Sequence, residues 1–505
     1  MYIRMKFAGI KPQRDGTLER LSTESAEGET QHIADKSLRQ KDRDTSTPAR
    51  FCAAVFWRLF VFPGSNQELI WLFFILFFKF RRKGENMSKQ MPIAAPHTWG
   101  KYTPDKIFTV VSNATQAKEA YGRDQVVNGA PGTFLDETET IFCLPTVETV
   151  YRSLPMNEVV AYSPLEGAPD FLEAAVQHVF RDFRPAAHIK AVATPGGTGA
   201  LHNIVANYTS VGDAVLSSEW CWGPYKSIAE DALRRFETFS LFAGDKFNLA
   251  EMEEKMAALL EKQERLVVIL NTPSHNPTGY SLTNEEWRAV LESAKKLAVP
   301  GRFIILAIDV AYLDYTEDQQ ASRSFFPLLA DLPENVLPII CFSMSKSFTL
   351  YGQRVGAMIG VSQSEHIADE FFKTNQITCR ASWSSINRGA SKVLAAIYAK
   401  PELIRKSDEE RAAALAIIRS RAALFSSEAK TAGLEFLPYR SGFFLTIPCQ
   451  RPEEVCQVLN KANIFLVPLA QGIRISVCAI PTSKMSGLAA KIKQAIERVN
   501  VQANQ

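Results

Sequence analysis

The stretch that decides the fold is LPIICFSMSKSFTLYGQRVG, residues 337–356. Its first six residues form an apolar run that is long enough for a buried strand and too short for a typical helix. Lys346 is therefore expected at the carboxyl end of a strand, where open α/β sheets bind their ligands. Small hydroxyl residues around Lys346 leave it partly desolvated, which favours the neutral amine and makes it an imine-forming nucleophile. Arg354 offers a planar fork suited to a phosphate.

Apolar runs typical of buried strands lie on both sides of this stretch and alternate with helical patterns. The runs are 191–193, 214–216, 266–270, 303–308, 336–342 and 357–361. Helical patterns include 200–208 and 287–297. This alternation predicts an α/β fold with a mostly parallel sheet and helices on both faces.

The length of 505 residues exceeds one ordinary core, so we expect more than one domain. A long charged helical pattern begins at about Pro401 and passes through Arg411 and Arg421. The segments 436–448 and 464–480 follow it and indicate a second, smaller α+β domain. The predicted parts are an N-terminal extension (1–86), the first part of the small domain (87–135), a large domain (136–400), and a linking helix with the rest of the small domain (401–505).

Composition narrows the class of protein. Hydrophobic residues make up 46% and charged residues 22%, which is typical of a soluble globular protein. A net charge of +3 gives no electrostatic case for binding nucleic acid. The eight cysteines form no CxxC pair and no histidine lies at metal-ligand spacing, so we expect no metal site. Such cysteines indicate a reducing compartment, and we expect a cytoplasmic protein.

Residues 1–86 differ from the rest of the chain. The first 50 are polar and lack sustained periodicity, which is typical of disorder. The apolar run 69–78 has about half of the roughly 20 residues that a membrane span needs. It also lies too far from the N-terminus for a secretory signal. A membrane-surface anchor stays an alternative, although we expect no membrane contact.

Our preferred hypothesis is that translation starts at Met87. Residues 81–86 can be encoded by an almost pure purine run that resembles a bacterial ribosome-binding site, directly before Met87. Residues 1–86 would then be missing from the native protein. An intact mass that retains them would contradict this hypothesis.

Two further stretches offer a phosphate cradle and an amide donor. TPGGTGAL, residues 194–201, follows a strand and opens a helix, so its glycines can aim free amides at an anion. NTPSHNPTG, residues 271–279, follows another strand, and Asn276 can donate to a phenolic oxygen from there. The Asn276–Pro277 bond is a candidate for the cis form. Taken singly, a glycine-rich turn and a proline-rich loop are the alternatives.

Two more stretches offer a carboxylate and an aromatic face. Asp309 follows the apolar strand 303–308, so its carboxylate is poorly solvated and needs a cationic partner. A pyridinium nitrogen would serve, and Tyr312 could reach the same ring. Trp222, in WCWGPY after the run 214–216, can stack on a flat heteroaromatic ring. A helix-capping aspartate and a core tryptophan are the alternatives.

Together these residues require a flat pyridine that carries a phosphate, a phenolic oxygen and an aldehyde, which is pyridoxal phosphate. With these motifs the chain resembles the fold-type I aminotransferases of class I/II, the aspartate and aromatic amino acid group. The resemblance covers about residues 100–500 and depends on Asn276-Pro277-Thr278-Gly279, Ser345-Lys346 and the spaced Arg354.

The resemblance implies a role for each of these residues. Lys346 would carry the cofactor through an imine, and Asp309 would pair with the ring nitrogen. Asn276 and Tyr312 would hold the phenolic oxygen, and Trp222 would stack on the ring. The phosphate would be bound by Gly197, Thr198, Ser343 and Arg354.

Further family positions concern the dimer and the substrate. Tyr162, in YSPLEG, corresponds to a tyrosine that reaches the phosphate of the neighbouring subunit, which implies a homodimer with shared sites. Arg474, in GIRISV, corresponds to the arginine that grips the substrate's α-carboxylate, and a bidentate pair is the physical reason for arginine there. Gly129 is expected to let that carboxylate approach the backbone.

The preferred substrate stays open between a dicarboxylate and an aromatic amino acid. Arg380 resembles the arginine with which aspartate-type members hold a side-chain carboxylate across the dimer. The segment 383–389 that follows is one residue shorter than the family pattern, and Tyr225 stands where aspartate-type members often carry a histidine. We favour a broad range of aspartate and aromatic substrates.

The resemblance implies ping-pong transfer of an amino group from an L-amino acid to a 2-oxo acid, with 2-oxoglutarate as the expected acceptor. A pyridoxal-phosphate-dependent lyase on the same fold is the alternative within enzymes. The fold also occurs as the sensor half of transcription regulators. However, residues 1–86 lack the paired amphipathic helices of a helix-turn-helix.

Overall fold

The computed structural model describes residues 93–99, 101 and 105–503. Residues 1–101 and 102–505 form two compact units, which are described separately. The described part of the first contains one short 3-10 helix, η2 (Pro96–Thr98). The expectations for residues 1–86 lie outside the described residues. Among the described residues, none of the helices has the length and hydropathy needed to cross a membrane.

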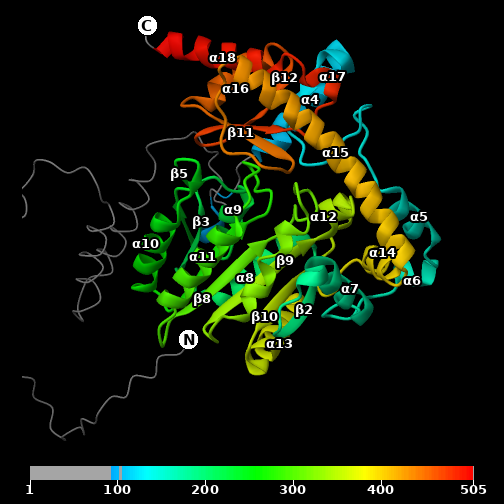
Figure 1. The fold of residues 1–505 in the computed structure, drawn as a ribbon, viewed down its shortest axis with the longest axis vertical. Coiled ribbons are helices and arrows are strands. Elements are labelled where there is room, and N and C mark those ends of the chain that lie inside the picture. Colours follow the sequence, from blue (N-terminus) through cyan, green and yellow to red (C-terminus); the bar gives the residue numbers. More distant parts are fainter. Residues whose placement is uncertain (1–92, 100, 102–104, 504–505) are drawn as a thin grey trace, which may run out of the picture. The chain divides into compact units, whose positions relative to one another are not determined.

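A seven-stranded sheet forms the centre of the second unit (Figure 1). Its strands are β2 (His188–Thr194), β3 (Ala214–Ser218), β4 (Arg235–Phe239), β7 (Arg265–Asn271), β8 (Phe303–Asp309), β9 (Val336–Ser343) and β10 (Gly356–Ser362). Their order is β2-β10-β9-β8-β7-β3-β4. Neighbours from β9 to β4 run parallel, whereas β10 is antiparallel to both β2 and β9. The predicted α/β fold with a mostly parallel sheet is confirmed.

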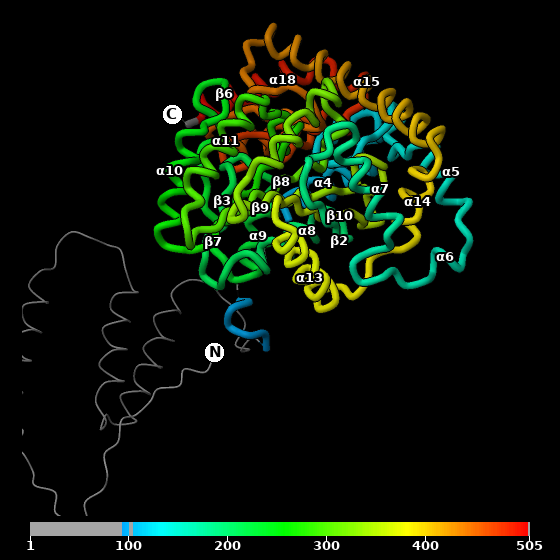
Figure 2. The backbone as a smooth tube through the Cα atoms, turned by 60° about the horizontal axis from the view of Figure 1, so that its bottom comes forward, coloured from blue at the N-terminus to red at the C-terminus, as the bar shows by residue number. Residues whose placement is uncertain are grey.

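Both faces of this sheet are covered by helices. In β7, Leu266, Val268 and Leu270 enter one hydrophobic core, and the alternate residues Val267 and Ile269 enter another. The first core is completed by α7 (Pro169–Phe180), α10 (Leu249–Leu260), α11 (Asn284–Leu297) and α14 (Arg388–Tyr398). The second is completed by α8 (Gly196–Tyr208), α9 (Pro224–Asp231) and α13 (Glu365–Ser382), and Figure 2 traces α8 and α13 side by side. Burial on both faces explains why the strands are continuous apolar runs in the sequence.

Strand β4 was not among the predicted strands. It lies at the edge of the sheet beyond β3, and most of its residues are only half-buried. Its sequence RFETF therefore mixes charged and apolar residues and leaves no continuous apolar run.

The C-terminal part packs around a second, smaller sheet. Helix α15 (Pro401–Thr431) leads to the three-stranded sheet β11-β14-β13, with bounds Phe444–Pro448, Gly472–Ser476 and Val467–Pro468. The helices α16 (Pro452–Asn460) and α18 (Leu488–Ala503) accompany it. The strand β1 (Val127–Asn128) pairs in parallel with β12 (Ile464–Phe465), so residues before the large sheet lie beside the C-terminal strands. The domain boundaries stay a prediction.

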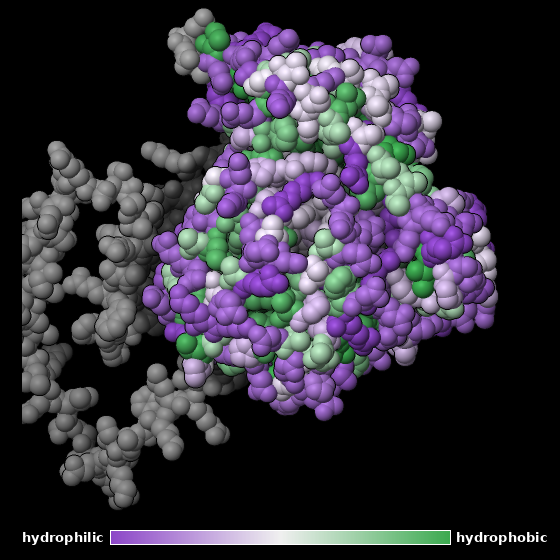
Figure 3. All heavy atoms as spheres, viewed as in Figure 1, coloured by the Kyte–Doolittle hydropathy of each residue, from purple (hydrophilic) through white to green (hydrophobic). Residues whose placement is uncertain are grey.

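The remaining elements are short or connect these layers. They are α4 (Lys106–Tyr121), α5 (Pro145–Ser153), α6 (Met156–Val160), α12 (Met344–Ser347), α17 (Thr482–Met485), β5 (Phe242–Ala243), β6 (Lys246–Phe247), η3 (Arg123–Gln125), η4 (Arg181–Phe183), η5 (Ala321–Arg323), η6 (Phe326–Ala330) and η7 (Tyr351–Gln353). On the face drawn in Figure 3, hydrophilic residues cover most of the surface and hydrophobic residues lie in smaller groups.

Two of the arginines in the predicted linking helix, Arg411 and Arg421, are fully buried. Arg411 Nε donates to the carbonyl of Ser347 at 2.7 Å, next to Lys346. Arg421 Nη1 donates to the carbonyls of Leu135 and Cys478 at 2.9 and 3.0 Å. Helix α15 is thus fastened both to the segment that carries Lys346 and to the C-terminal core.

A buried ionic network lies beside the large core. Asp314 Oδ1 accepts from Arg323 Nη2 at 2.6 Å, and Asp314 Oδ2 lies 2.8 Å from His178 Nε2. Burial raises the pKa of Asp314, but His178, Arg411 and Arg323 outweigh it and hold that pKa well below its usual range. Burial lowers the pKa of His178 to about 4, so Arg323 is needed as a charged partner at neutral pH.

Removal of Arg323 is therefore expected to destabilise the fold strongly. Arg323→Met leaves the buried Asp314 carboxylate without a directly bonded cation, a change that typically costs about 3–5 kcal/mol. The matched control is Arg405→Met, because Arg405 pairs with Glu409 over the same 2.6 Å on an exposed helix surface. Such exposed pairs contribute about 0–1 kcal/mol. Urea unfolding of both variants measures the difference, and equal losses would contradict the role given to the buried pair.

Candidate active site

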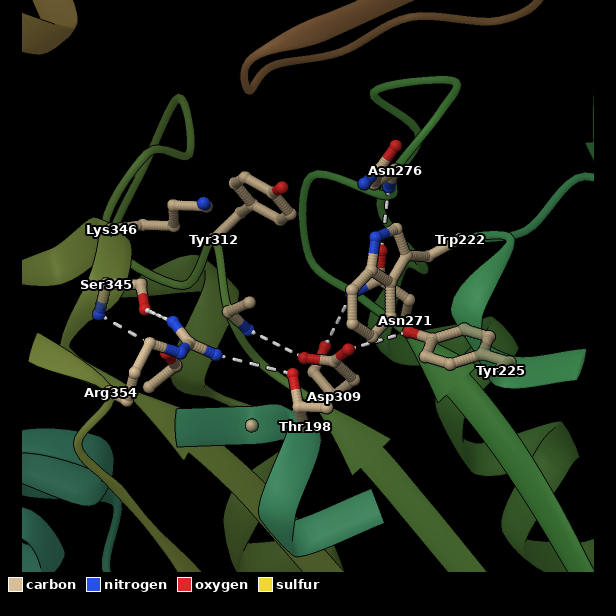
Figure 4. Close-up of a pocket in the computed structure, with 13 residues that line it drawn as sticks. Thr198, Trp222, Tyr225, Asn271, Asn276, Asp309, Tyr312, Ser345, Lys346 and Arg354 are labelled. Atoms are coloured by element: carbon tan, nitrogen blue, oxygen red, sulfur yellow. Dashed lines mark hydrogen bonds between the residues drawn. The ribbon is translucent and has the colours of Figure 1, made fainter. Parts of the chain in front are cut away.

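The carboxyl ends of β7, β8 and β9 meet at one edge of the sheet. The last residues of β7 and β8, Asn271 and Asp309, are partners in the ladder, and Asp309 is also the partner of Cys341 in β9. The loops that follow carry Asn276, Tyr312 and Lys346 to the same edge (Figure 4). This confirms the predicted position of Lys346 just beyond a strand.

A pocket of about 160 Å³ opens at this edge. It is lined by Gly197, Thr198, Trp222, Tyr225, Asn271, Asn276, Asp309, Ala311, Tyr312, Ser343, Ser345, Lys346 and Arg354. Nine of these are predicted site residues, drawn from segments that lie far apart in the sequence: Gly197, Thr198, Trp222, Asn276, Asp309, Tyr312, Ser343, Lys346 and Arg354. In Figure 4, Lys346 and Arg354 lie on one side of the pocket, Trp222 and Tyr225 on the other, and Asp309 between them.

Lys346 is a desolvated amine. Its Nζ lies 5.0 Å from the centroid of the Tyr351 ring and 6.0 Å from that of Tyr312. It forms no ion pair within the described residues 105–503, and burial lowers its pKa to about 8. The backbone beneath it is fixed, because the Tyr315 hydroxyl donates to the Lys346 carbonyl at 3.1 Å. A substantial fraction of neutral amine is therefore present near neutral pH.

Asp309 is a buried carboxylate, 6% exposed, without a cationic ion pair in the described part of the chain. Its Oδ2 accepts from the Tyr225 hydroxyl at 2.6 Å, and its Oδ1 accepts from the Ala311 amide at 3.1 Å. Burial raises the pKa of Asp309, while these two hydrogen bonds and the charge of Lys346 oppose the rise. The carboxylate can accept a further cationic donor from the pocket.

The glycine-rich turn and Arg354 form an anion site. Helix α8 begins at Gly196, which has a φ of +70° and whose Cβ, if added, would lie 3.1 Å from Arg354 Nη2. Arg354 donates to Ser345 Oγ at 3.1 Å and Thr198 Oγ1 at 3.4 Å, and it has no carboxylate partner within the described residues. Free amides at a helix N-terminus and an unpaired guanidinium together suit a phosphate.

Asn276 is held at the rim by the loop after β7. The backbone N–H of Asn276 donates to Asn271 Oδ1 at 2.7 Å, and Asn271 Nδ2 in turn donates to the backbone carbonyl of Asp309 at 2.9 Å. The Asn276–Pro277 bond is cis, as predicted. Tyr312 packs against Phe443 and Phe444, with ring centroids 5.3 and 5.7 Å apart.

Arg474 extends the site from β14. Its Nη1 donates to Asn276 Oδ1 at 3.4 Å, its Nη2 donates to the Ala130 carbonyl at 2.8 Å, and its guanidinium lies 4.3 Å from the Phe444 ring centroid. Its buried Nε has no hydrogen-bond partner within the described residues. Burial lowers the pKa of Arg474 to about 10. A buried guanidinium in this state requires an anionic partner.

Besides Arg474, three predicted site residues do not line the pocket of their own chain. Tyr162 is 90% exposed, and Arg380 is exposed with its Nη1 donating to Ser384 Oγ at 2.6 Å. Gly129 is buried, and a Cβ there would lie 2.6 Å from Leu466 and 3.0 Å from Ile480. Packing therefore explains the glycine, and the role of Gly129 toward a substrate stays a prediction.

Four pocket residues are missing from the predicted site: Tyr225, Asn271, Ala311 and Ser345. Asn271 is the last residue of β7, and Ser345 lies two residues beyond the end of β9, so their positions in the sequence could have indicated them. Within the described residues, no cluster of three or more His, Cys, Asp or Glu side chains is arranged to hold a metal ion.

A family model described as aminotransferase class I and II matches residues 127–492 of this chain. The chain belongs to this family. The match spans every pocket residue and Arg474.

Several known aminotransferases resemble the chain over most of its length. An aminotransferase from Anaerococcus prevotii, known from a crystal structure, has 34% sequence identity to this chain and a TM-score of 0.79. The match covers 80% of this chain and 100% of the Anaerococcus chain. The aspartate aminotransferase of Escherichia coli is 26% identical over 72% of this chain and 91% of its own. An aromatic-amino-acid aminotransferase from Burkholderia pseudomallei, covalently bound to pyridoxal phosphate, shares the fold at 22% identity, with a TM-score of 0.67 over 80% of this chain and 100% of its own.

The lowered pKa of Lys346 predicts a specific dependence of stability on pH. Between about pH 8 and pH 10.5 the unfolded apoprotein binds a proton on this lysine that the folded apoprotein does not, so rising pH favours folding there. Lys346→Met removes the effect. At pH 7 this variant should be more stable than the wild type by on the order of 1–3 kcal/mol, and the gap should shrink toward pH 10.5.

Urea unfolding of both apoproteins at several pH values measures this gap. Lys373→Met, on the exposed surface of α13, is the control for loss of a lysine as such. A gap that stays constant or widens as the pH rises would contradict the desolvation of Lys346.

Proposed function

We propose that the chain is a pyridoxal-phosphate-dependent aminotransferase that moves the amino group of aspartate or an aromatic amino acid to a 2-oxo acid, with 2-oxoglutarate as the acceptor. The observation that carries the proposal is the desolvated Lys346 in one pocket with the Asp309 carboxylate and the Arg354 guanidinium, neither of which has an ion-pair partner among the described residues. Family membership and the names of the similar proteins support the same reaction.

The residues present fit this cofactor by charge and chemistry. The amides at Gly197 and Thr198, the Ser343 hydroxyl and Arg354 would bind the phosphate. Asp309 would accept a hydrogen bond from the protonated ring nitrogen. The protonated ring nitrogen would be the cationic donor that the buried Asp309 carboxylate requires.

The other pocket residues fit the rest of the cofactor's ring. Asn276 and Tyr312 would bind the phenolic oxygen, and Trp222 would cover the ring. Lys346 would hold the cofactor covalently.

When bound, pyridoxal phosphate supplies an aldehyde that accepts the amino group and a protonated ring that withdraws electrons from the substrate's α-carbon. Lys346 Nζ, with its pKa near 8, is the group that takes the α-proton and holds it for return. Arg474 binds the α-carboxylate through the face that includes its unpaired Nε, and this fixes the α-carbon near Lys346. Because one site serves both substrates in turn, the expected kinetics are ping-pong.

We also propose a homodimer in which Tyr162 and Arg380 act in the partner's site. Both side chains are exposed and lie outside the pocket of their own chain. Near Tyr162 the apolar side chains of Met156 and Val160 are 70% and 71% exposed, which suits burial against a second copy. Tyr162 would reach the phosphate, and Arg380 would bind the side-chain carboxylate of a dicarboxylic substrate.

A cytoplasmic location accompanies this proposal. The seven cysteines among the described residues are all free thiols. Free buried thiols suit a reducing compartment.

The half-reactions test the function. Aspartate, tyrosine or phenylalanine added to the holoenzyme should change the absorption band of the bound cofactor, and 2-oxoglutarate should restore it. Lys346→Ala should slow the change by about 10²–10⁴-fold, because it removes the proton-transferring amine, whereas Lys373→Met should leave it unchanged. Release of ammonia without a 2-oxo acid would instead identify a lyase, and a band that no amino acid changes would contradict catalysis.

A further inference from the structure

Tyr225 forms a short hydrogen bond to Asp309 from outside the large sheet. The residue lies in the first turn of α9 and is 1% exposed. Its hydroxyl donates to Asp309 Oδ2 at 2.6 Å, and Figure 4 shows its ring directed at that carboxylate. The Trp222 ring meets the Tyr225 ring edge-on, with centroids 5.5 Å apart and planes at 84°. The same short segment therefore carries Trp222, which is predicted to stack on the cofactor ring, and Tyr225, which donates to Asp309, the predicted partner of the ring nitrogen.

The hydrogen bond has two consequences for Asp309. It favours the ionised form of a carboxyl group that burial alone would tend to protonate. Together with the Ala311 amide on Oδ1, it also fixes the plane of the carboxylate from both oxygens. A neutral or rotated carboxyl group could not serve as the charged acceptor for a ring nitrogen.

We propose that Tyr225 is a positioning residue that holds Asp309 ionised and aligned toward the cofactor's ring nitrogen, using a donor that does not titrate in the working pH range. The inference rests on the proposed function, because it takes Asp309 as the partner of that nitrogen. A tyrosine hydroxyl stays protonated where a histidine in the same place would gain or lose a proton. The partner of Asp309 therefore has the same charge at pH 5.5 and at pH 8.5.

Among the described residues, none of the groups with the largest effects on the pKa of Asp309 or Tyr225 is a histidine. The titratable groups that interact with Asp309 or Tyr225 are Lys346, Tyr312, Cys341 and Cys221, which come from α12, the loop after β8, β9 and the loop before α9. Burial and the charge of Asp309 raise the pKa of Tyr225 well above 10. Burial raises the pKa of Cys341 and of Cys221 as well, so Lys346 is the group in this set that titrates near neutral pH.

The test compares the affinity of apoprotein variants for pyridoxal phosphate, measured by equilibrium dialysis from pH 5.5 to pH 8.5. Tyr225→Phe should raise the Kd about tenfold or more, because it removes a hydrogen bond to a charged group. The ratio of its Kd to that of the wild type should rise toward pH 5.5, because the Asp309 carboxyl group is easier to protonate without this hydrogen bond, whereas the cofactor phosphate and Lys346 titrate in both proteins. Tyr225→His should give a ratio that falls toward pH 5.5, because the new imidazole gains a proton and a positive charge beside Asp309.

Two further variants separate the possible outcomes. Tyr280→Phe is the matched control, because the Tyr280 hydroxyl donates to Glu286 over the same 2.6 Å and its ring is equally buried, but it lies outside the pocket. Its Kd should equal that of the wild type. Asp309→Asn should weaken binding more than Tyr225→Phe does.

A Tyr225→Phe protein that binds within twofold of the wild type, while Asp309→Asn binds tenfold or more weakly, would overturn the role of Tyr225 alone. If neither variant changes the Kd, the proposed role of Asp309 fails as well. A pH-independent ratio for a folded Tyr225→His protein would also overturn the proposal. Circular dichroism of each apoprotein establishes that it is folded.

Discussion

The parallel register of β7, β8 and β9 is the constraint on which the site depends. Because Asn271 and Asp309 are ladder partners, the two strands end level with each other, and their loops emerge at one edge. Asn271 links the loops directly, since its side chain accepts from the Asn276 amide and donates to the Asp309 carbonyl. The backbone that continues from β9 then presents Lys346 to the same space.

Charges that the chain does not pair are concentrated around this space. Lys346, Asp309, Arg354 and Arg474 lack ion-pair partners among the described residues, whereas the buried Asp314 nearby is paired with Arg323. Burying the unpaired charges of Asp309 and Arg474 costs free energy, and the fold offsets that cost with its large apolar cores. A phosphate would pair with Arg354, a cationic ring nitrogen with Asp309 and a substrate carboxylate with Arg474. Lys346 would form the covalent bond to the cofactor. The pocket is therefore built for a cofactor and a substrate together.

Much of the fold could be predicted from the sequence because both faces of the large sheet are buried. Continuous apolar runs such as 266–270 and 303–308 therefore mark the strands, and the polar residues just after them, Asp309 and Lys346, mark the site. The reversed direction of β10 could not be predicted, because an apolar run has the same pattern in either direction.

Contacts that form only in the folded chain could not be predicted from the sequence either. The hydrogen bond from Tyr225 to Asp309 joins residues that are 84 positions apart, and it depends on how α9 packs against the sheet. The burial of Arg411 likewise results from tertiary packing. The charged residues around it in α15 are typical of an exposed helix, so nothing in the sequence indicated it. The roles proposed for Tyr162 and Arg380 require a second chain, so no pattern within one chain could test them.

The covalent role of Lys346 is the central claim, and reductive trapping tests it most directly. The holoenzyme would be treated with borohydride and digested, and its peptides analysed by mass spectrometry. The account predicts that the reduced cofactor's mass lies on the peptide that contains Lys346 and is missing from Lys346→Ala. Its attachment to another lysine, or to none, would contradict the account.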